Sequence, residues 1–304
     1  MRVDPFYVTN LVGSLDQAQA SVQQLTSELS SGVSVTSLSQ NPVASGENVL
    51  LLNQIQQDDS FTTSSSLVTG QLQVADSALG SVVTQQTSAI SLATSANNGT
   101  MNSSNVKSVS TQISGILDEV ESLANTSYQG QYIFAGGQIS TAPFSTSTGT
   151  SPAVTTYNGD QDVNYLETPS GQKIQLNVSG SQIFMGTGSN SVFGALNSLV
   201  ADYSSGTVDT AQAVSDTEAL SAALNNVSQQ RVTIDNSITQ VTAASDAVTN
   251  VETQLTTAQT NLMQADIPTV STQLSLSETQ QTALEDVIAQ LNSSSNDLFS
   301  KLPA

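Results

Sequence analysis

Three residue types are missing from this sequence, and basic residues are scarce. The chain of 304 residues contains no cysteine, no histidine and no tryptophan, and only 5 residues are lysine or arginine. Without cysteine there is neither a disulfide framework nor a thiolate metal site. Without histidine the chain lacks the usual general base, the commonest transition-metal ligand and the partner of most nucleophilic serines. We therefore predict a protein that is not an enzyme, with no catalytic residues, no metal site and no cofactor.

The charge is strongly negative. The sequence has 25 acidic and 5 basic residues, which gives a formal net charge of −20 at pH 7. Because nucleic acids and anionic membrane surfaces repel such a chain, we expect neither as a partner. The opening residues 1–6 lack the apolar core of a Sec-type signal peptide, and no apolar run reaches the roughly 18 residues of a membrane span. These features favour the cytoplasm, but a protein exported without a cleaved signal peptide would show the same pattern.

Acidic groups that invite a chemical interpretation do not fit one. Asp160, Asp162 and Asn164 match the first ligand positions of a calcium-binding EF-hand loop, but Tyr165 stands where glycine is needed and Gly171 where glutamate is needed. A solvated turn explains these residues better. Two further carboxylate groups are typical of solubilising helix faces, because neither comes with a recognisable base: Asp58-Asp59 and Asp118-Glu119 with Glu121.

A heptad ladder near the C-terminus is the strongest positive feature. Apolar residues occupy seven consecutive slots spaced seven apart: Leu220, Val227, Ile234, Val241, Val248, Leu255 and Leu262. Small or apolar residues fill most of the row three positions on: Ala223, Ala244, Val251, Ala258 and Ala265. A seven-residue repeat is slightly shorter than two helical turns, so this seam must follow a partner helix.

Both ends of the chain carry further ladders. The N-terminal ladder stops at Gly32, which suits a helix C-terminus, and consists of Val8, Leu11, Leu15, Ala18, Val22, Leu25 and Leu29. The C-terminal ladder follows a helix break predicted at 265–268, with Asp266 as the N-cap, and consists of Val270, Leu274, Leu284, Ile288, Leu291 and Leu298. Two more helices are predicted over 68–96 and 106–123. An amphipathic helix usually packs inside its own domain, so both an intramolecular and an intermolecular bundle remain open.

The middle of the chain changes character between residues 131 and 188. Strands are predicted at 132–134, and at 154–157 and 163–166 as a hairpin around the turn Asn158-Gly159-Asp160. A second turn is predicted at 168–171, and a helix begins again after Ser191. The predicted fold class is therefore mainly α with a small β-rich insert, in which a long antiparallel helical bundle or coiled coil is built from both termini. The predicted domains are an N-terminal helical arm (1–130), the insert (131–188) and a C-terminal helical arm (189–304).

Several motifs resemble those of the flagellar hook-associated protein 3 family (FlgL, the hook–filament junction proteins), which is related to flagellin. The segments that carry the resemblance are Ser30-Ser31-Gly32, Gln40-Asn41-Pro42-Val43-Ala44, Leu123-Ala124-Asn125-Thr126, Tyr132-Ile133-Phe134-Ala135-Gly136, Tyr157-Asn158-Gly159-Asp160, Gln280-Gln281-Thr282-Ala283-Leu284 and the closing Leu298-Phe299. Gln40 and Asn41 depart from an acidic pair in the family pattern. The block from Leu123 to Gly136 is the most specific match.

The resemblance implies a structural role in the bacterial flagellum and in motility. Family members form a ring layer of identical subunits that joins the hook, through the first hook-associated protein, to the flagellin filament. They are exported by the flagellar type III apparatus without a cleaved signal peptide, and an export chaperone binds their C-terminal helix. The expected location is extracellular, at the hook–filament junction. By this resemblance the assembly contacts lie on the two terminal ladders, from Val8 to Leu29 and from Val270 to Leu298, and the β-rich insert faces outward.

Two other functions fit the same residues. The chain could be a short flagellin that forms the filament itself, in which case it would be the dominant filament protein rather than a minor one. It could also be a secreted binding module or enzyme with helical export arms, which a ligand pocket in the 131–188 insert would favour.

Overall fold

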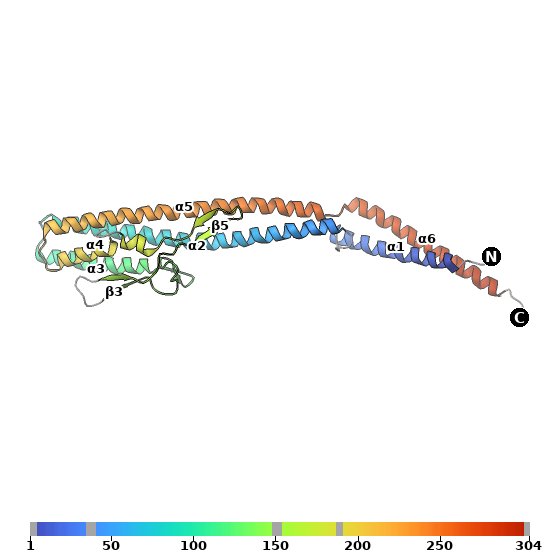
Figure 1. Ribbon diagram of the computed structural model, residues 1–304, viewed down its shortest axis with the longest axis horizontal. Coiled ribbons are helices and arrows are strands. Elements are labelled where there is room, and N and C mark those ends of the chain that lie inside the picture. Colours follow the sequence, from blue (N-terminus) through green and yellow to red (C-terminus); the bar gives the residue numbers. More distant parts are fainter. Residues whose placement is uncertain (1–4, 35–40, 148–153, 187–190, 301–304) are drawn as a thin grey trace. The chain divides into compact units, whose positions relative to one another are not determined.

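The computed structural model describes residues 5–34, 41–147, 154–186 and 191–300, with side chains described from residue 9 to residue 291 within these ranges. Helices dominate it (Figure 1), and they are α1 (Pro5–Ser31), α2 (Pro42–Asn97), α3 (Ser103–Ala124), a π-helix η1 (Ser181–Met185), α4 (Val192–Ser204), α5 (Thr210–Met263) and α6 (Ile267–Ser300). The strands are β1 (Ser127–Tyr128), β2 (Gln131–Tyr132), β3 (Phe144–Thr146), β4 (Thr155–Tyr157), β5 (Tyr165–Glu167) and β6 (Lys173–Gln175). The predicted fold class is confirmed.

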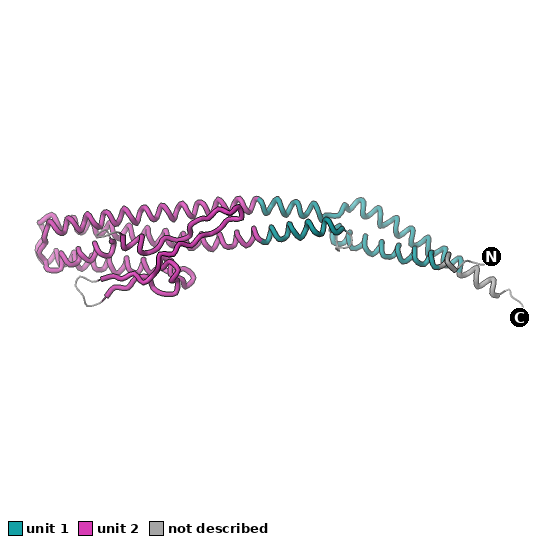
Figure 2. The backbone as a smooth tube through the Cα atoms, in the orientation of Figure 1, with its two compact units in different colours: residues 1–56, 251–304 teal, residues 57–250 magenta. Residues whose placement is uncertain are grey.

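The chain divides into two compact units (Figure 2). Unit 1 contains residues 1–56 and 251–304, and unit 2 contains residues 57–250. Both units draw on residues far apart in the sequence, since α2 and α5 each contribute to both. The amino-terminal and carboxy-terminal helices therefore fold together, as the paired ladders predicted.

Polar side chains start most of the helices. Asn41 Oδ1 accepts a hydrogen bond from Ala44 N (3.0 Å) at the start of α2, and Asn102 Oδ1 accepts one from Asn105 N (2.8 Å) at the start of α3. Ser191 Oγ accepts one from Gly194 N (3.1 Å) before α4. The predicted cap Asp266 accepts hydrogen bonds from the backbone N (3.4 Å) and the hydroxyl (2.7 Å) of Thr269. Each cap satisfies amide groups that have no partner inside the helix.

Unit 2 contains the hydrophobic core. The first five members of the α5 heptad ladder are buried there, from Leu220 to Val248, whereas Leu255 and Leu262 in unit 1 are half-buried. The ladders predicted on α2 and α3 bury Leu79, Val82 and Ile113 in the same core. The heptad prediction is thus confirmed for the part of α5 that has helices packed along it.

Polar contacts join the helices of unit 2. Arg231 of α5 donates from Nε (2.6 Å) and from one terminal nitrogen (3.2 Å) to the carboxylate of Asp76 on α2. Tyr203 of α4, fully buried, donates its hydroxyl to Asn97 Oδ1 (2.8 Å). Ser110 of α3 donates to Val200 O on α4 (2.8 Å). These bonds set the register of four helices whose apolar seams alone would permit sliding.

The β-rich segment forms three separate two-stranded antiparallel sheets, β1–β2, β3–β4 and β5–β6. The turn predicted at 168–171 is confirmed, because it joins β5 to β6. The predicted hairpin around 158–160 is wrong, since β4 pairs with the earlier β3 and β5 pairs with the later β6.

A loop contact explains the difference. Asp160 Oδ1 accepts hydrogen bonds from Gly137 N (2.6 Å) and Asp162 N (3.0 Å), and Asp160 N donates to Ala135 O (3.1 Å). The turn residues therefore dock on the segment after β2 and do not close a hairpin. Asp160 acts as a loop cap here, and no described group of three His, Cys, Asp or Glu side chains is arranged to hold a metal ion.

Aromatic packing joins the β-rich segment to the helices. The Phe144 ring lies 5.1 Å from Phe193 of α4 and 5.2 Å from Phe184 of η1, measured between ring centroids. Phe134 packs edge-on against Phe184 at 5.6 Å. All four rings are buried, so the 131–188 segment belongs to the core of unit 2 as well as to its surface.

Candidate assembly interface

The terminal helices α1 and α6 pack against each other in unit 1. They run antiparallel, because the end of α1 is joined to the start of α6: Ala265 N donates to Gly32 O (2.9 Å) and Ser34 N donates to Met263 O (2.7 Å). Gly32 has a φ of +69°, the left-handed conformation predicted for the end of the first helix. The backbone thus holds the two ladders side by side.

The chain covers its terminal ladders only in part. Of the twelve residues predicted as assembly contacts, Val270 is buried and Leu29 is exposed. Eight are half-buried, namely Leu11, Leu15, Val22, Leu25, Leu274, Leu284, Ile288 and Leu291. Val8 and Leu298 lie on α1 and α6, but their side chains fall outside the described part of the chain. The structure brings the two ladders together and leaves part of their apolar surface in solvent.

Unit 1 has almost no interior of its own. Among the described residues, only four of its apolar side chains are buried, and they are small: Ala18, Ala44, Ala265 and Val270. In contrast, ten of the fifteen exposed large apolar side chains in the described part of the chain lie in this unit: Val12, Leu29, Val43, Val49, Leu50, Leu52, Val251, Ile267, Leu276 and Val287. Because exposed apolar surface is where a partner molecule would bind, we take unit 1 as the candidate assembly interface.

Some of these exposed residues were missed by the sequence reasoning. Val49 and Leu50, at the start of α2, are 56% and 70% exposed. Leu276 is 60% exposed on a face of α6 outside the predicted ladder. The signal was present in the run Val49-Leu50-Leu51-Leu52, which is apolar around the whole helix and so cannot be buried by one partner face.

A groove runs between the terminal helices. It has a volume of about 540 Å³ and is lined on α1 by Ser14, Gln17 and Ser21, and on α6 by Ala283 and Leu284 among others. Small side chains such as Ser14, Ser21 and Ala283 permit the close approach of the two helices here.

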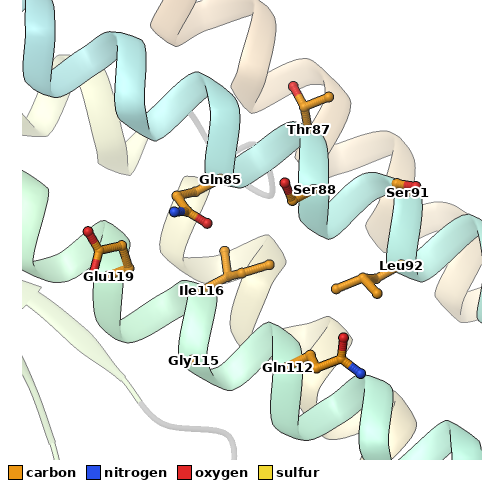
Figure 3. Close-up of a pocket in the computed structure, with 9 residues that line it drawn as sticks. All are labelled: Gln85, Thr87, Ser88, Ser91, Leu92, Gln112, Gly115, Ile116 and Glu119. Carbon is orange, nitrogen blue, oxygen red and sulfur yellow. The ribbon is translucent and has the colours of Figure 1, made fainter.

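Unit 2 carries a different groove between α2 and α3 (Figure 3). Leu92 of α2 and Ile116 of α3 point into the gap between the helices, and Gln85 and Gln112 stand at its sides. Its volume is about 760 Å³, and Glu119 adds a carboxylate to its lining. The residues that line this groove do not include a typical nucleophile paired with a base, so we interpret the groove as a surface and not as a reactive centre.

Two carboxylates lie close together where α4 ends and α5 begins. Burial, followed by the neighbouring Asp216, raises the pKa of Asp202 to about 6. Asp202 Oδ2 is shielded from solvent and has no hydrogen-bond partner in the described structure. The pair lies in unit 2, away from the terminal helices in sequence, and Asp202 holds its proton to a higher pH than an ordinary aspartate does.

Comparison with known proteins identifies the relatives of this chain. A family described as the bacterial flagellin N-terminal helical region matches residues 8–138. Flagellar hook-associated protein 3 of Salmonella typhimurium is 30% identical over 187 residues, which cover 61% of this chain and 57% of that protein. The same protein of Escherichia coli is 29% identical over 187 residues, with the same coverage. The match thus spans somewhat more than half the length of these relatives, and it confirms the resemblance inferred from the motifs.

Solved structures show the same fold. A putative flagellar hook-associated protein from Vibrio parahaemolyticus superimposes with a TM-score of 0.68 at 18% identity, covering 74% of this chain and all of that one. Hook-associated protein 3 from Legionella pneumophila gives 0.61 at 12% identity, covering 70% and 98%. Among the described residues, no helix is apolar over a stretch long enough to cross a membrane.

Proposed function

We propose that this chain, as a homologue of flagellar hook-associated protein 3, is a structural subunit of the bacterial flagellum at the junction of hook and filament. The observation that carries the proposal is the incomplete interior of unit 1, combined with the kinship to hook-associated proteins. Copies of the chain form a ring layer, which contacts the first hook-associated protein on one side and flagellin on the other. Its role is structural and not enzymatic.

Assembly completes the interior that unit 1 lacks. Burying a leucine, isoleucine or valine side chain fully contributes about 1.5–3 kcal/mol, and every subunit of a ring repeats the same contact. Half-buried residues such as Leu284 and Ile288 gain the remaining part of this energy when helices of neighbouring subunits cover them. The net charge of −20 opposes the approach of copies, so assembly strengthens as salt screens the repulsion.

The remaining expectations form part of the same proposal. Within the helical arms 1–130 and 189–304, the terminal ladders from Val8 to Leu29 and from Val270 to Leu298 supply assembly contacts, and 131–188 faces outward. The chain leaves the cell through the flagellar type III apparatus with no cleaved signal peptide and acts outside the cell. The seam of α6, which is only half-buried, suits binding by an export chaperone before secretion.

A gene deletion tests the proposal. If the chain is the junction subunit, the deletion strain builds hooks but sheds flagellin monomers into the medium, because the adaptor layer is missing. Filaments of normal length and number on the deletion strain would refute the junction role.

A second candidate is a short flagellin, which the match to the flagellin N-terminal region favours. Copy number separates the two functions. A flagellin is the dominant protein of sheared filaments, whereas a junction subunit is a minor species there, and quantitative mass spectrometry of sheared filaments measures the ratio directly.

A further inference from the structure

A groove in unit 2 lies where η1, β6 and α5 meet. It has a volume of about 780 Å³. Five amide side chains line it: Gln161, Gln175, Gln182, Asn226 and Gln230. Met185 of η1 and Ala222 of α5 add apolar surface. None of its lining residues carries a charge, although the chain has 25 acidic residues.

Part of the groove wall is held in place by hydrogen bonds within the chain. Asn226 Nδ2 on α5 donates to Gln182 O (2.8 Å) and Ile183 O (3.0 Å), which fixes the π-helical turn η1 against α5. Gln175 Nε2 donates to Asn177 O (2.8 Å). A π-helical turn is a rare conformation that occurs frequently at functional sites. The wall is therefore preformed, which lowers the entropy lost when a ligand binds.

Other amides of the groove are available to a ligand. Within the described structure, the side chains of Gln161 and Gln182 make no hydrogen bond to the rest of the chain, and both are exposed. Gln230 donates only a long contact of 3.5 Å to Asn226 Oδ1. An amide side chain presents two donors and an acceptor, so these three residues offer both kinds of group.

An exposed aromatic residue lies opposite another lining amide, Gln175, in the β5–β6 sheet. Tyr165 of β5 is directly opposite Gln175 of β6 in the antiparallel ladder, so both side chains project from the same face of that sheet. Tyr165 is 56% exposed, whereas the neighbouring pair Leu166 and Ile174 projects from the other face, where Ile174 is buried. Tyr165 is outside the lining itself, but its pairing with Gln175 puts its exposed side chain on the same sheet face as that lining amide.

We propose that this groove binds a neutral carbohydrate, with Tyr165 stacked on a sugar ring and the amides of Gln182 and Gln230 paired with its hydroxyl groups. A charged ligand would meet no opposite charge in the lining, and an apolar ligand would cover amides without bonding them. A neutral sugar has hydroxyl groups that both donate and accept, and it has an apolar C–H face that fits an aromatic ring. This binding site goes beyond the structural role and does not depend on it.

Saturation-transfer NMR on the full chain tests the proposal, with maltopentaose, cellopentaose and chitopentaose as probes. We expect signal transfer to at least one of the three sugars. In the double variant Gln182→Ala/Gln230→Ala, the loss of two hydrogen bonds weakens binding about tenfold or more. The matched control is Gln85→Ala/Gln112→Ala, which removes two amides from the α2–α3 groove (Figure 3) and leaves sugar binding unchanged.

The aromatic contact has its own pair of variants. Tyr165→Ala abolishes the transfer signal, whereas Tyr165→Phe keeps the aromatic ring and therefore keeps the signal. Thermal unfolding of each variant checks that it folds like the original chain. The proposal is overturned if none of the three sugars receives signal, or if the Gln182→Ala/Gln230→Ala and Tyr165→Ala variants bind as the original does. Loss of self-association in these variants without any sugar binding would assign the groove to a second copy of the chain and also overturn it.

Discussion

Replacing two exposed leucines of unit 1 by aspartate tests assembly without disturbing the fold of the subunit. Leu50 on α2 is 70% exposed and Leu276 on α6 is 60% exposed. Full burial of a leucine contributes about 1.5–3 kcal/mol, so covering the exposed part of each contributes about 1–2 kcal/mol. The double variant Leu50→Asp/Leu276→Asp therefore loses roughly 2–4 kcal/mol of apolar contact and also buries two carboxylates without partners. We expect the dissociation constant between subunits to rise at least about a hundredfold.

The isolated subunit should be unaffected, because substitutions at exposed positions usually change stability by about 0.5 kcal/mol or less. A matched control is Leu67→Asp, an exposed leucine on the part of α2 that belongs to unit 2 (48% exposed). Sedimentation velocity compares the assembly of the three proteins, and denaturant unfolding compares their stabilities. Complementation of the deletion strain, at matched levels of secreted protein, then measures filament attachment and swimming.

The outcome shows whether the exposed apolar surface of unit 1 is used in assembly. We expect only the unit 1 double variant to fail to assemble and to retain filaments. If this variant assembles and supports swimming as well as the original chain, the apolar surface of unit 1 is not the assembly surface. If Leu67→Asp fails equally, charge repulsion and not the loss of a specific contact would explain the result.

Three further outcomes follow from single features of the structure. The pKa of Asp202 is about 6 in the folded state against an ordinary value of 3.8, so the folded state binds the extra proton and the stability that this proton contributes is lost as pH rises through 6. In urea unfolding, Asp202→Asn therefore has a free energy of unfolding about 1 kcal/mol higher than the original chain at pH 7.5, after solvent screening, and an equal one below pH 4. Equal stability of the two proteins at pH 7.5 would contradict this. Gln86 is fully buried, and neither polar atom of its side-chain amide has a hydrogen-bond partner in the described structure. Replacing it with methionine, which has a similar shape and no amide to leave unpaired, raises the free energy of unfolding by about 1–3 kcal/mol. Destabilisation would instead indicate a buried water bound to the amide. Hydrogen exchange in the monomer is fast over residues 9–31 and 267–291 and slow over 72–93, and it slows in the terminal segments on assembly; slow exchange at both ends of a verified monomer would oppose the assembly model.

Much of the helical structure could be predicted from the residues alone. The heptad slots of α5 predicted the buried positions from Leu220 to Val248, and Gly32 and Asp266 marked a helix end and a helix start that the structure contains. These predictions succeed because a helix is closed by bonds four residues apart, so spacing and capping residues carry the information locally. The motif between Leu123 and Gly136 likewise indicated the relatives before any contact was known.

Only the tertiary structure decided which strands pair. Each strand from β3 to β6 has three residues, too few for alternation to select a partner, and the choice rests on the docking of Asp160 on Gly137 and on the packing of Phe144 against Phe184 and Phe193. The amide-lined groove and the Asp202–Asp216 pair arise in the same way, from residues that share no sequence pattern.

The candidate assembly surface could be predicted in part from the sequence and was decided in part by the tertiary structure. The ladders predicted it on the terminal helices, since apolar periodicity requires a partner face. Periodicity does not say whether that partner comes from the same chain. The structure answers this through burial: α1 and α6 cover each other only in part, and Val49, Leu50 and Leu276 remain in solvent because unit 1 has no further helix that covers them within the described chain. How much apolar surface stays uncovered is a property of all the packed elements together, so the tertiary structure alone could decide it.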